Sequence, residues 1–323
     1  MVKRSRYFKV MLVALLILGF SAPAKVNASV AEPQVRKMIL DVDMNTDTDD
    51  LLAIRACEKL DKEGKEDLIG VCMSVTGGEN ALASLLSYDG YGHVPVGISS
   101  EYISDSSPYW EYLESIYKPD NEMVDAVKLY RKLLSESETR ISIVTTGYLT
   151  NIYELLKSGP DEYSNLSGTE LVRQKVRAIH VTGGNLIDHI DNNYAYVDEA
   201  KVAADYVFEH WPAGIPAVIY TQDLGGNMYL GYDLDKNDPV YSCIRLAGRN
   251  ESTAWDIFNV WAFSKMDYND LSSVHLSLKH CYVDVTEDGR DVITDDESAP
   301  WWRIVKLWAD NNWYKKQVGM LLK

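Results

Sequence analysis

Five aspartates lie within ten residues of the segment KMILDVDMNTDTDDLLAI, directly after an apolar run. They are Asp41, Asp43, Asp47, Asp49 and Asp50. Carboxylates this close repel one another, and burying them is costly unless a cation is bound beside them. The apolar residues on both sides of the segment argue against a solvated acidic surface. The segment is therefore either a metal site or an ordinary loop whose aspartates cap a helix.

Three later segments combine polar residues with apolar runs. They read TTGYLTN (145–151), GGNLIDHIDNNY (183–194) and STAWDIFNVWAF (252–263), the last with Asp256 at the start of an apolar helix. Each has a simple structural interpretation: a helix cap, a glycine turn, and an acid in the first turn of a helix. Whether they act together depends on where the fold places them.

Short apolar runs alternate with amphipathic stretches along the chain. The apolar runs cover 37–42, 68–75, 94–98, 141–146, 176–183 and 215–221, and the amphipathic stretches include 49–64, 123–137 and 198–211. Runs that are apolar almost throughout are typical of strands buried on both faces of a parallel sheet. The alternation predicts an α/β fold with a doubly wound, mainly parallel sheet and helices on both faces. Ligands bind at the carboxyl ends of such strands, where the polar segments fall.

The polar segments resemble, in order, the motifs of the calcium-dependent nucleoside hydrolases, the inosine–uridine-preferring enzymes and their relatives. DVDMNTDTDDLLA is similar to the first motif of the branch that reads DTDMGNDVDDALA, and VTTGYLTNI to VPTGGLTNI. VTGGN resembles the MGG turn, DNNYAYVDEA lies without gaps on EFNxxxDPEA, and AWDIFNVWA resembles the final HDPxAVA or WDxxAVL segment. The resemblance runs from about Val35 into the C-terminal helices. It implies a nucleoside hydrolase-like, Rossmann-like fold.

The resemblance implies a bound Ca²⁺. By position, Asp43 and Asp50 match two carboxylate ligands, Thr146 the threonine whose backbone carbonyl binds the ion, and Asp256 the last carboxylate ligand. Oxygen ligands of this kind suit Ca²⁺ chemically. Asp43 also matches the general base, which takes a proton from the Ca²⁺-bound water as the N-ribosidic bond breaks. The sugar passes through an oxocarbenium-like state, as in glycoside hydrolysis.

The resemblance also implies residues that bind the substrate, a nucleoside or another ribosyl compound. Asp49 matches the acid that binds a ribose hydroxyl, Asn193 the asparagine that holds the ribose, and Asp191 the acid near its 5′ end. Asn185 is a looser match to another ribose-binding asparagine, because the loop from Gly184 to Asp191 is shorter than usual. Asn80 is a weaker candidate of the same kind.

Three departures from the family pattern affect the interpretation. Asn45 replaces a glycine, and asparagine tolerates positive φ better than most residues if the turn needs it. Trp255 stands where many members have histidine and purine-specific members have tryptophan, so its ring is a candidate for stacking on a purine or a core aromatic. Asp47 is an extra residue whose role is open, and Asp41 is expected to orient the loop.

Two other functional classes stay open. A phosphotransferase of the haloacid-dehalogenase type is suggested by ILDVDMN, although its later lysine and acid pair cannot be placed in order. The second is an exported nucleoside- or sugar-binding protein that keeps the fold without catalysis. Loss of Asp43 or Asp256 would favour that reading, and both are present. The family resemblance further implies a homo-oligomer, a dimer or tetramer.

Residues 1–28 read as a secretory signal peptide. VKRSRYFK supplies a basic start, VMLVALLILGF (10–20) is apolar but too short to span a membrane, and VNA precedes a cleavage position at Ser29. We therefore expect export to the periplasm or the extracellular space, with no membrane association after cleavage. An uncleaved anchor is the alternative. These residues carry five of the 32 Lys and Arg and no Asp or Glu, so removing them shifts the net charge from −16 to −21.

A chain this acidic lacks the basic surface that nucleic acid requires. Residues 29–323 are enough for one catalytic domain, and no linker or repeat divides them.

The four cysteines are Cys57, Cys72, Cys243 and Cys281, and their spacing is not that of a metal site. Export permits disulfides, whereas the apolar surroundings of Cys57 and Cys72 favour buried thiols.

Overall fold

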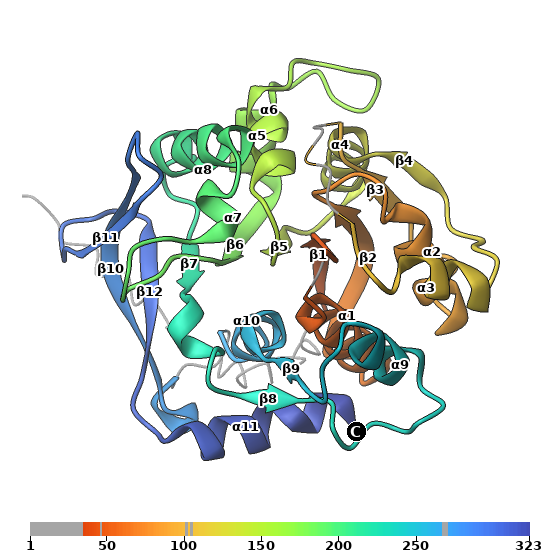
Figure 1. The fold of residues 1–323 in the computed structure, drawn as a ribbon. Coiled ribbons are helices and arrows are strands. Elements are labelled where there is room, and N and C mark those ends of the chain that lie inside the picture. Colours follow the sequence, from red (N-terminus) through yellow and green to blue (C-terminus); the bar gives the residue numbers. More distant parts are fainter. Residues whose placement is uncertain (1–34, 46, 101–102, 104–105, 267–270) are drawn as a thin grey trace, which may run out of the picture. The chain divides into compact units, whose positions relative to one another are not determined.

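A computed structural model describes residues 35–45, 47–100, 103, 106–266 and 271–323. Contacts within the chain group Val35–Lys323 into one compact unit (Figure 1). The predicted signal peptide, residues 1–28, lies outside the described residues, so its prediction stays untested. No helix among the described residues is long and apolar enough to cross a membrane.

The described residues form a large mixed sheet whose strands are mainly parallel. Its ten strands follow the order β11-β10-β12-β7-β6-β5-β1-β2-β3-β4, and β8 pairs separately with β9. The strands from β12 to β4 are parallel to their neighbours, whereas β10 runs antiparallel to β11 and β12. The strands are Arg36–Val42 (β1), Glu66–Met73 (β2), Val96–Ile98 (β3), Met123–Asp125 (β4), Ile141–Thr145 (β5), Val176–Thr182 (β6), Ala217–Tyr220 (β7), Tyr229–Leu230 (β8), Ser252–Thr253 (β9), Leu276–Val285 (β10), Asp291–Asp295 (β11) and Trp302–Leu307 (β12).

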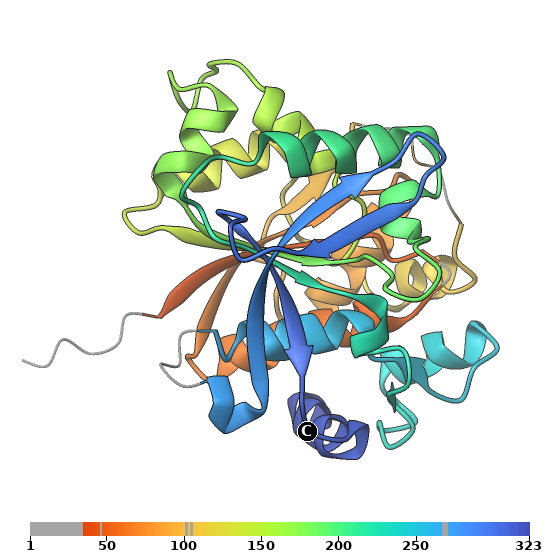
Figure 2. The ribbon, with the colours of Figure 1, turned by 90° about the vertical axis from the view of Figure 1, so that its left-hand side faces the viewer.

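Helices cover both faces of this sheet, as Figure 2 shows edge-on. One layer contains α4 (Ala126–Glu136), α5 (Thr150–Lys157), α6 (Gly168–Lys175) and α8 (Asp198–His210). The other contains α1 (Asp49–Lys62), α2 (Glu79–Tyr88), α3 (Trp110–Ile116), α9 (Pro239–Leu246), α10 (Trp255–Phe263) and α11 (Asn311–Gly319). Short α7 (Asn192–Ala195) and three 3₁₀ turns, Gln222–Leu224 (η1), Leu271–Val274 (η2) and Met320–Leu322 (η3), complete the described elements. The predicted doubly wound α/β fold is confirmed.

β1 shows how the sequence builds the two layers. Met38, Leu40 and Val42 pack in the core under α1 and α10, whereas Ile39 packs in the core under α4 and α5. Side chains alternate between the faces of a strand, so an apolar run serves both cores. By the same alternation Asp41 faces the side of Ile39.

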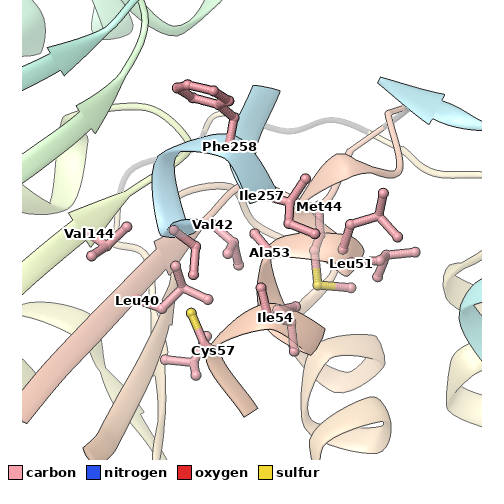
Figure 3. Packing of buried hydrophobic residues seen from close by; sticks show 14 of the residues in the cluster. Leu40, Val42, Met44, Leu51, Ala53, Ile54, Cys57, Val144, Ile257 and Phe258 are labelled. Atoms are coloured by element: carbon pink, nitrogen blue, oxygen red, sulfur yellow. The ribbon is translucent and has the colours of Figure 1, made fainter. Parts of the chain in front are cut away.

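The packing of α1 against α10 fixes the acidic ends of both helices. Figure 3 shows Ala53 and Ile54 of α1 and Ile257 of α10 gathered beside Leu40 and Val144. All five side chains are fully buried. α1 begins with Asp49 and Asp50, and α10 carries Asp256 in its first turn. A close-packed core resists displacement, so it holds these carboxylates in fixed positions at the carboxyl edge of the sheet.

The four cysteines are buried free thiols. Cys57 lies in α1, Cys72 in β2, Cys243 in α9 and Cys281 in β10. Burial raises the pKa of each thiol, which disfavours the reactive thiolate. They therefore act as small core residues.

Candidate functional site: an acidic cavity at the carboxyl edge of the sheet

A cavity of about 260 Å³ opens at the carboxyl ends of the central strands. It lies at the ends of the paired strands β1 and β5, where Asp41 is opposite Thr145. After β1 the chain continues to β2 on one side of this pair, and after β5 it continues to β6 on the other side. Such a switch point is the usual ligand site of doubly wound sheets. The cavity collects most of the residues singled out in the sequence: Asp43, Asn45, Asp47, Asp49, Thr146, Asp191, Asn193, Trp255 and Asp256.

Three carboxyl groups, those of Asp43, Asp49 and Asp256, line it, and the carboxyl group of Asp50 lies beside them, where it accepts from the Thr146 hydroxyl without lining the cavity. Asp43, Asp49, Asp50 and Asp256 are each at most 7 % exposed. Burial is the main cause that raises the pKa of all four, and for Asp43, Asp49 and Asp256 neighbouring carboxylates raise it further. The carboxyl groups of Asp43 and Asp50 lie in contact, as do those of Asp49 and Asp256, and each pair shifts the pKa of its members. Two carboxyl groups in such contact need a shared proton or a cation between them.

These carboxyl groups match the donor chemistry of Ca²⁺. The residues that line the cavity offer carboxylate, amide, hydroxyl and backbone oxygens, and within the described part of the chain no His, Cys or Met lines it. Hard cations such as Ca²⁺ take oxygen ligands of this kind. Among the described residues, no group of three or more His, Cys, Asp or Glu side chains has the arrangement of a formed metal site. The residues therefore fit the ion chemically, and the structure shows no coordination geometry for it.

The loop that carries Asp43 is held by hydrogen bonds to its backbone. The carboxylate of Asp50 accepts from the Met44 N–H at 2.7 Å and from the Thr146 hydroxyl at 2.7 Å. The Trp110 indole donates to the Met44 carbonyl at 2.7 Å. Met44 has φ 27°, whereas Asn45 does not have positive φ. The turn therefore does not need positive φ at Asn45, because the backbone reverses one residue earlier, at Met44, and brings the Met44 N–H to Asp50.

Asp41 connects strand and helix ends below the cavity, and no hydrogen bond from its side chain reaches the loop that it was expected to orient, among the described residues. Its fully buried carboxylate accepts from the Tyr130 hydroxyl at 2.8 Å and from the Asn151 amide at 3.1 Å. Burial raises its pKa to about 7, against the two hydrogen bonds, which lower it. The same Asn151 amide donates to the Met73 carbonyl at 2.9 Å. Asp41 therefore connects β1 to β2, α4 and α5.

Asp47, the extra residue of the motif, lines the outer part of the cavity. Its carboxylate forms an ion pair with Arg249, at 2.5 Å, and the Tyr109 hydroxyl donates to its backbone carbonyl at 2.8 Å. Both charged side chains are more than one third exposed, so the ion pair contributes little stability. Its visible effect is to hold the rim of the cavity against the segment after α9.

Asn193 and Asp191 reach the cavity from the loop after β6. The Asn193 amide donates to the Thr146 carbonyl at 2.8 Å and to the Thr182 carbonyl at 3.2 Å, and thus bridges the ends of β5 and β6. Asp191 caps α7 by accepting from the Asn193 N–H at 2.8 Å. Burial and the nearby carboxylate of Asp291 raise the pKa of Asp191 to about 7.

Two predicted ribose-binding residues do not line the cavity. Asn80 is exposed near the start of α2. The side chain of Asn185 organises its own loop: it donates to the Ile190 carbonyl at 3.2 Å and to Gln222 at 3.3 Å, and it accepts from the Ile187 N–H at 2.9 Å. Asn185 thus stands behind Gln222, which itself lines the cavity. Direct binding of ribose by either asparagine stays a prediction.

Aromatic side chains form part of the cavity wall. The Trp255 indole donates to the Gln222 carbonyl at 2.7 Å, which fixes the orientation of its ring. Tyr148 and Tyr196 also line the cavity and stack on each other, with ring centroids 6.4 Å apart. Neither tyrosine was among the residues predicted from the sequence. Tyr148 directly follows the TTG turn, and Tyr196 lies within DNNYAYVDEA, so only their place inside the motifs could have indicated them.

Gly147 allows the two central loops to approach each other. A Cβ atom there would lie 2.4 Å from the Ser74 hydroxyl oxygen and 2.7 Å from the Asp43 Cβ. Both distances are far shorter than van der Waals contact. The close packing beside Asp43 therefore requires glycine at this position.

No protein-family model and no curated protein sequence matches this chain. Solved structures do. The inosine–uridine-preferring nucleoside hydrolase of Bacillus anthracis superposes with a TM-score of 0.62 and 14 % identity, over 89 % of this chain and 99 % of that one. The purine-preferring ribonucleoside hydrolase of Gardnerella vaginalis gives 0.62 and 17 %, over 89 % and 99 %. The chain has the nucleoside hydrolase fold.

The type III effector protein XopQ, solved with adenosine diphosphate ribose, is also similar to this fold. Its TM-score is 0.59 at 15 % identity, over 90 % of this chain and 93 % of that one. Structural similarity at such low sequence identity establishes the fold of the present chain. The activity of the chain has to be inferred from the chemistry of its own site.

Proposed function

We propose that this protein is an N-glycosyl hydrolase that cleaves the N-ribosidic bond of nucleosides into base and ribose. The observation that supports the proposal best is the convergence of Asp43, Asp49, Asp50 and Asp256 with Thr146 at one edge of the sheet. Buried carboxylates are costly unless they serve a cation or a cationic transition state. An oxocarbenium-like ribose is such a transition state, and carboxylates that face it would stabilise its charge.

Within this proposal each side chain has a role. Asp43, Asp50, Asp256 and the Thr146 carbonyl would hold Ca²⁺, which when bound supplies positive charge that lowers the pKa of water. Asp43 would act as the general base. Asp49 would accept a hydrogen bond from a ribose hydroxyl.

The remaining roles concern orientation and the leaving group. Asn193 would position the ribose from the bridge between β5 and β6. Trp255, with its indole fixed by Gln222, would stack on the departing base, which favours purines because they offer the larger ring system. This arrangement supports a role in purine salvage.

We also propose export after cleavage near Ser29, on the basis of the sequence signal, and assembly into a dimer or tetramer, on the basis of the resemblance. N-terminal sequencing of the native protein would test the first. Light scattering would test the second. Retention of Met1 in a membrane fraction would contradict export.

A second candidate is a protein that binds a ribosyl ligand without cleaving it. It is favoured by the similarity to XopQ, whose structure contains adenosine diphosphate ribose. A reducing-sugar assay on a panel of purine and pyrimidine nucleosides, with and without Ca²⁺, separates the two. Calorimetry with the same nucleosides detects binding. Binding without release of ribose would replace the hydrolase by the binding protein.

A further inference from the structure

Asn259 is a buried polar residue to which the proposed reaction assigns no role. It lies in α10, three residues after Asp256, and its side chain is fully buried. Residues three apart on a helix share one face, so Asn259 lies on the face of α10 that also carries Asp256. It is not among the described residues that line the cavity. Asn259 therefore lies behind the cavity, in the helix that carries one proposed Ca²⁺ ligand.

The Asn259 amide joins α10 to the ends of two strands. Its nitrogen donates to the Thr182 hydroxyl, at the end of β6, at 2.9 Å. It also donates to the Thr145 carbonyl, at the end of β5, at 3.4 Å, which is a longer and weaker contact. Reversing the amide would place its oxygen against the Thr145 carbonyl, where two acceptors repel each other, so the nitrogen must face the strands.

Packing alone does not explain an amide at this place. Oδ1 of Asn259 is buried and has no hydrogen-bond partner within the described part of the chain. Buried polar atoms normally have partners, and one without a partner costs free energy. A leucine would fill a similar volume without that cost. It could not, however, hold α10 in a fixed direction from the strand ends, because only the amide makes directional hydrogen bonds there.

A second asparagine holds the same two strand ends from the other side of the cavity wall. Asn193 donates to the backbone carbonyls of Thr146 and Thr182, whereas Asn259 donates to the Thr145 carbonyl and to the Thr182 hydroxyl. Two buried or half-buried amides thus bridge β5 and β6. Only the Asn259 amide, of these two, also connects the strands to α10.

The proposed Ca²⁺ ligands come from three separate parts of the fold. Asp43 and Asp50 lie in the segment that runs from β1 into α1, the Thr146 carbonyl follows β5, and Asp256 lies in α10. One ion can bind all of these oxygens only if the three parts keep fixed separations. The Asn259 amide connects α10 to the end of β5, one residue before Thr146.

We propose that Asn259 is a positioning residue for the Ca²⁺ site, whose amide fixes Asp256 relative to the Thr146 carbonyl so that both oxygens reach one ion. The inference rests on the proposed function, which assigns these two oxygens to Ca²⁺. Asn259 itself touches neither the ion nor the substrate. Site groups have to lie within about 0.5 Å of their productive positions, so a shift of α10 along the strand ends weakens the binding of the ion.

The affinity for Ca²⁺, measured by calorimetry on the folded protein without a nucleoside, tests this role. Residues that orient metal ligands typically contribute about 10- to 100-fold to metal affinity, so we expect Asn259→Leu to weaken Ca²⁺ binding at least about tenfold. The rise in Tm that Ca²⁺ produces should shrink accordingly. At saturating Ca²⁺ we expect kcat to recover, because the substitution removes no group that touches the substrate.

Asn121→Leu is the matched control. Asn121 is also buried, and its amide also bridges two backbone carbonyls, those of Tyr91 at 2.9 Å and of Val94 at 2.7 Å. It does not belong to the described lining of the cavity. The urea midpoint of unfolding without Ca²⁺ reports any general loss of stability in either variant. Only Asn259→Leu should change the affinity for Ca²⁺.

Thr182→Val provides a second variant with a smaller change. It keeps nearly the same shape but removes the hydroxyl that accepts from Asn259, so we expect it to weaken Ca²⁺ binding in the same direction by a smaller factor. Should Asn259→Leu fail to fold, Thr182→Val decides, and an affinity equal to that of the wild type then overturns the proposal.

The remaining outcomes separate the positioning role from the proposed function. Wild-type Ca²⁺ affinity in a folded Asn259→Leu protein, or an equal loss of affinity in Asn121→Leu, would reduce Asn259 to a structural role and overturn the proposal. A wild type that binds no Ca²⁺ would contradict the metal site, and the positioning role with it. A wild type that binds Ca²⁺ but cleaves no nucleoside would contradict the hydrolase, while the comparison of Ca²⁺ affinities still decides the role of Asn259.

Discussion

The side-chain amide of Asn193 donates to the backbone carbonyl of Thr146 at 2.8 Å. The family resemblance assigns these two residues to different tasks, the ribose and the metal. Their hydrogen bond connects the two proposed tasks, so we expect one residue to support both. A carbonyl oxygen has two lone pairs, so the Thr146 carbonyl keeps one for a cation while Asn193 orients it.

Replacing Asn193 by alanine should therefore affect ribose and Ca²⁺ together. We expect Asn193→Ala to raise KM, to lower kcat, and to weaken Ca²⁺ affinity, because the Thr146 carbonyl loses its anchor. Asn237→Ala, the same change at an exposed loop position, is the control. Steady-state kinetics and Ca²⁺ titration by calorimetry check it. Ca²⁺ affinity equal to that of the wild type would show that the bridge does not support the metal.

Removal of Ca²⁺ should lower both activity and stability. An ion that binds only the folded state stabilises it by about 2.7 kcal/mol at a hundredfold excess over Kd. For a chain of this size we expect chelation to lower Tm by roughly 4 °C. Asp256→Asn should lose most of this Ca²⁺-dependent gain, whereas Asp288→Asn, at an exposed turn, should keep it. Elemental analysis that finds a transition metal in place of Ca²⁺ would contradict the assignment.

Asp43→Asn tests the general base. The change keeps an oxygen ligand and nearly the same volume, but an amide cannot accept the proton. General acid–base groups contribute on the order of 10²–10⁴ in rate, so we expect kcat to fall at least about a hundredfold while a ribosyl ligand still binds. Ion occupancy is measured in parallel at saturating Ca²⁺. Near-wild-type turnover with the ion bound would move the role to Asp49 or Asp47, and Asp47→Asn would then be the informative variant.

The fold and most of the acidic cavity were predictable because their signals are local. Strands buried on both faces appear in the sequence as apolar runs. The aspartates that follow β1 can be recognised from that segment alone, without the rest of the chain. The central sheet and the clustering of Asp43, Asp49 and Asp256 are confirmed in this way.

What the sequence did not indicate depends on exposed edges and long-range contacts. β10 has only three buried residues, Leu276, Cys281 and Val285, so no apolar run marks it. β4, β11 and β12 were missed as well. Asp291 lies far from Asp191 along the chain, and no spacing rule connects them. Asn80 was favoured by its motif-like surroundings, but α2 places it on the surface.

The raised pKa of Asp191 predicts a stability that falls as the pH rises. Burial and Asp291 raise the pKa of its carboxyl from 3.8 to about 7 in the folded protein. The folded state therefore binds this proton more tightly than the unfolded state. Well below pH 4 the carboxyl group is protonated in both states, so its titration does not change the free energy of unfolding. Between about pH 4 and pH 7 the unfolded state loses its proton first, so the free energy of unfolding decreases with pH, by up to about 4 kcal/mol.

Asp191→Asn should remove this decrease, since an amide does not titrate and asparagine still caps a helix. We expect the variant to match the wild type near pH 4 and to exceed it in unfolding free energy at pH 8. Urea unfolding of both proteins in the same buffer, at several pH values from 4 to 8, measures the difference directly. The comparison cancels the titration of buried carboxyl groups that do not interact with Asp191, which both proteins share. A difference that stays constant across this range would show that Asp191 is ionised in the folded protein already at low pH.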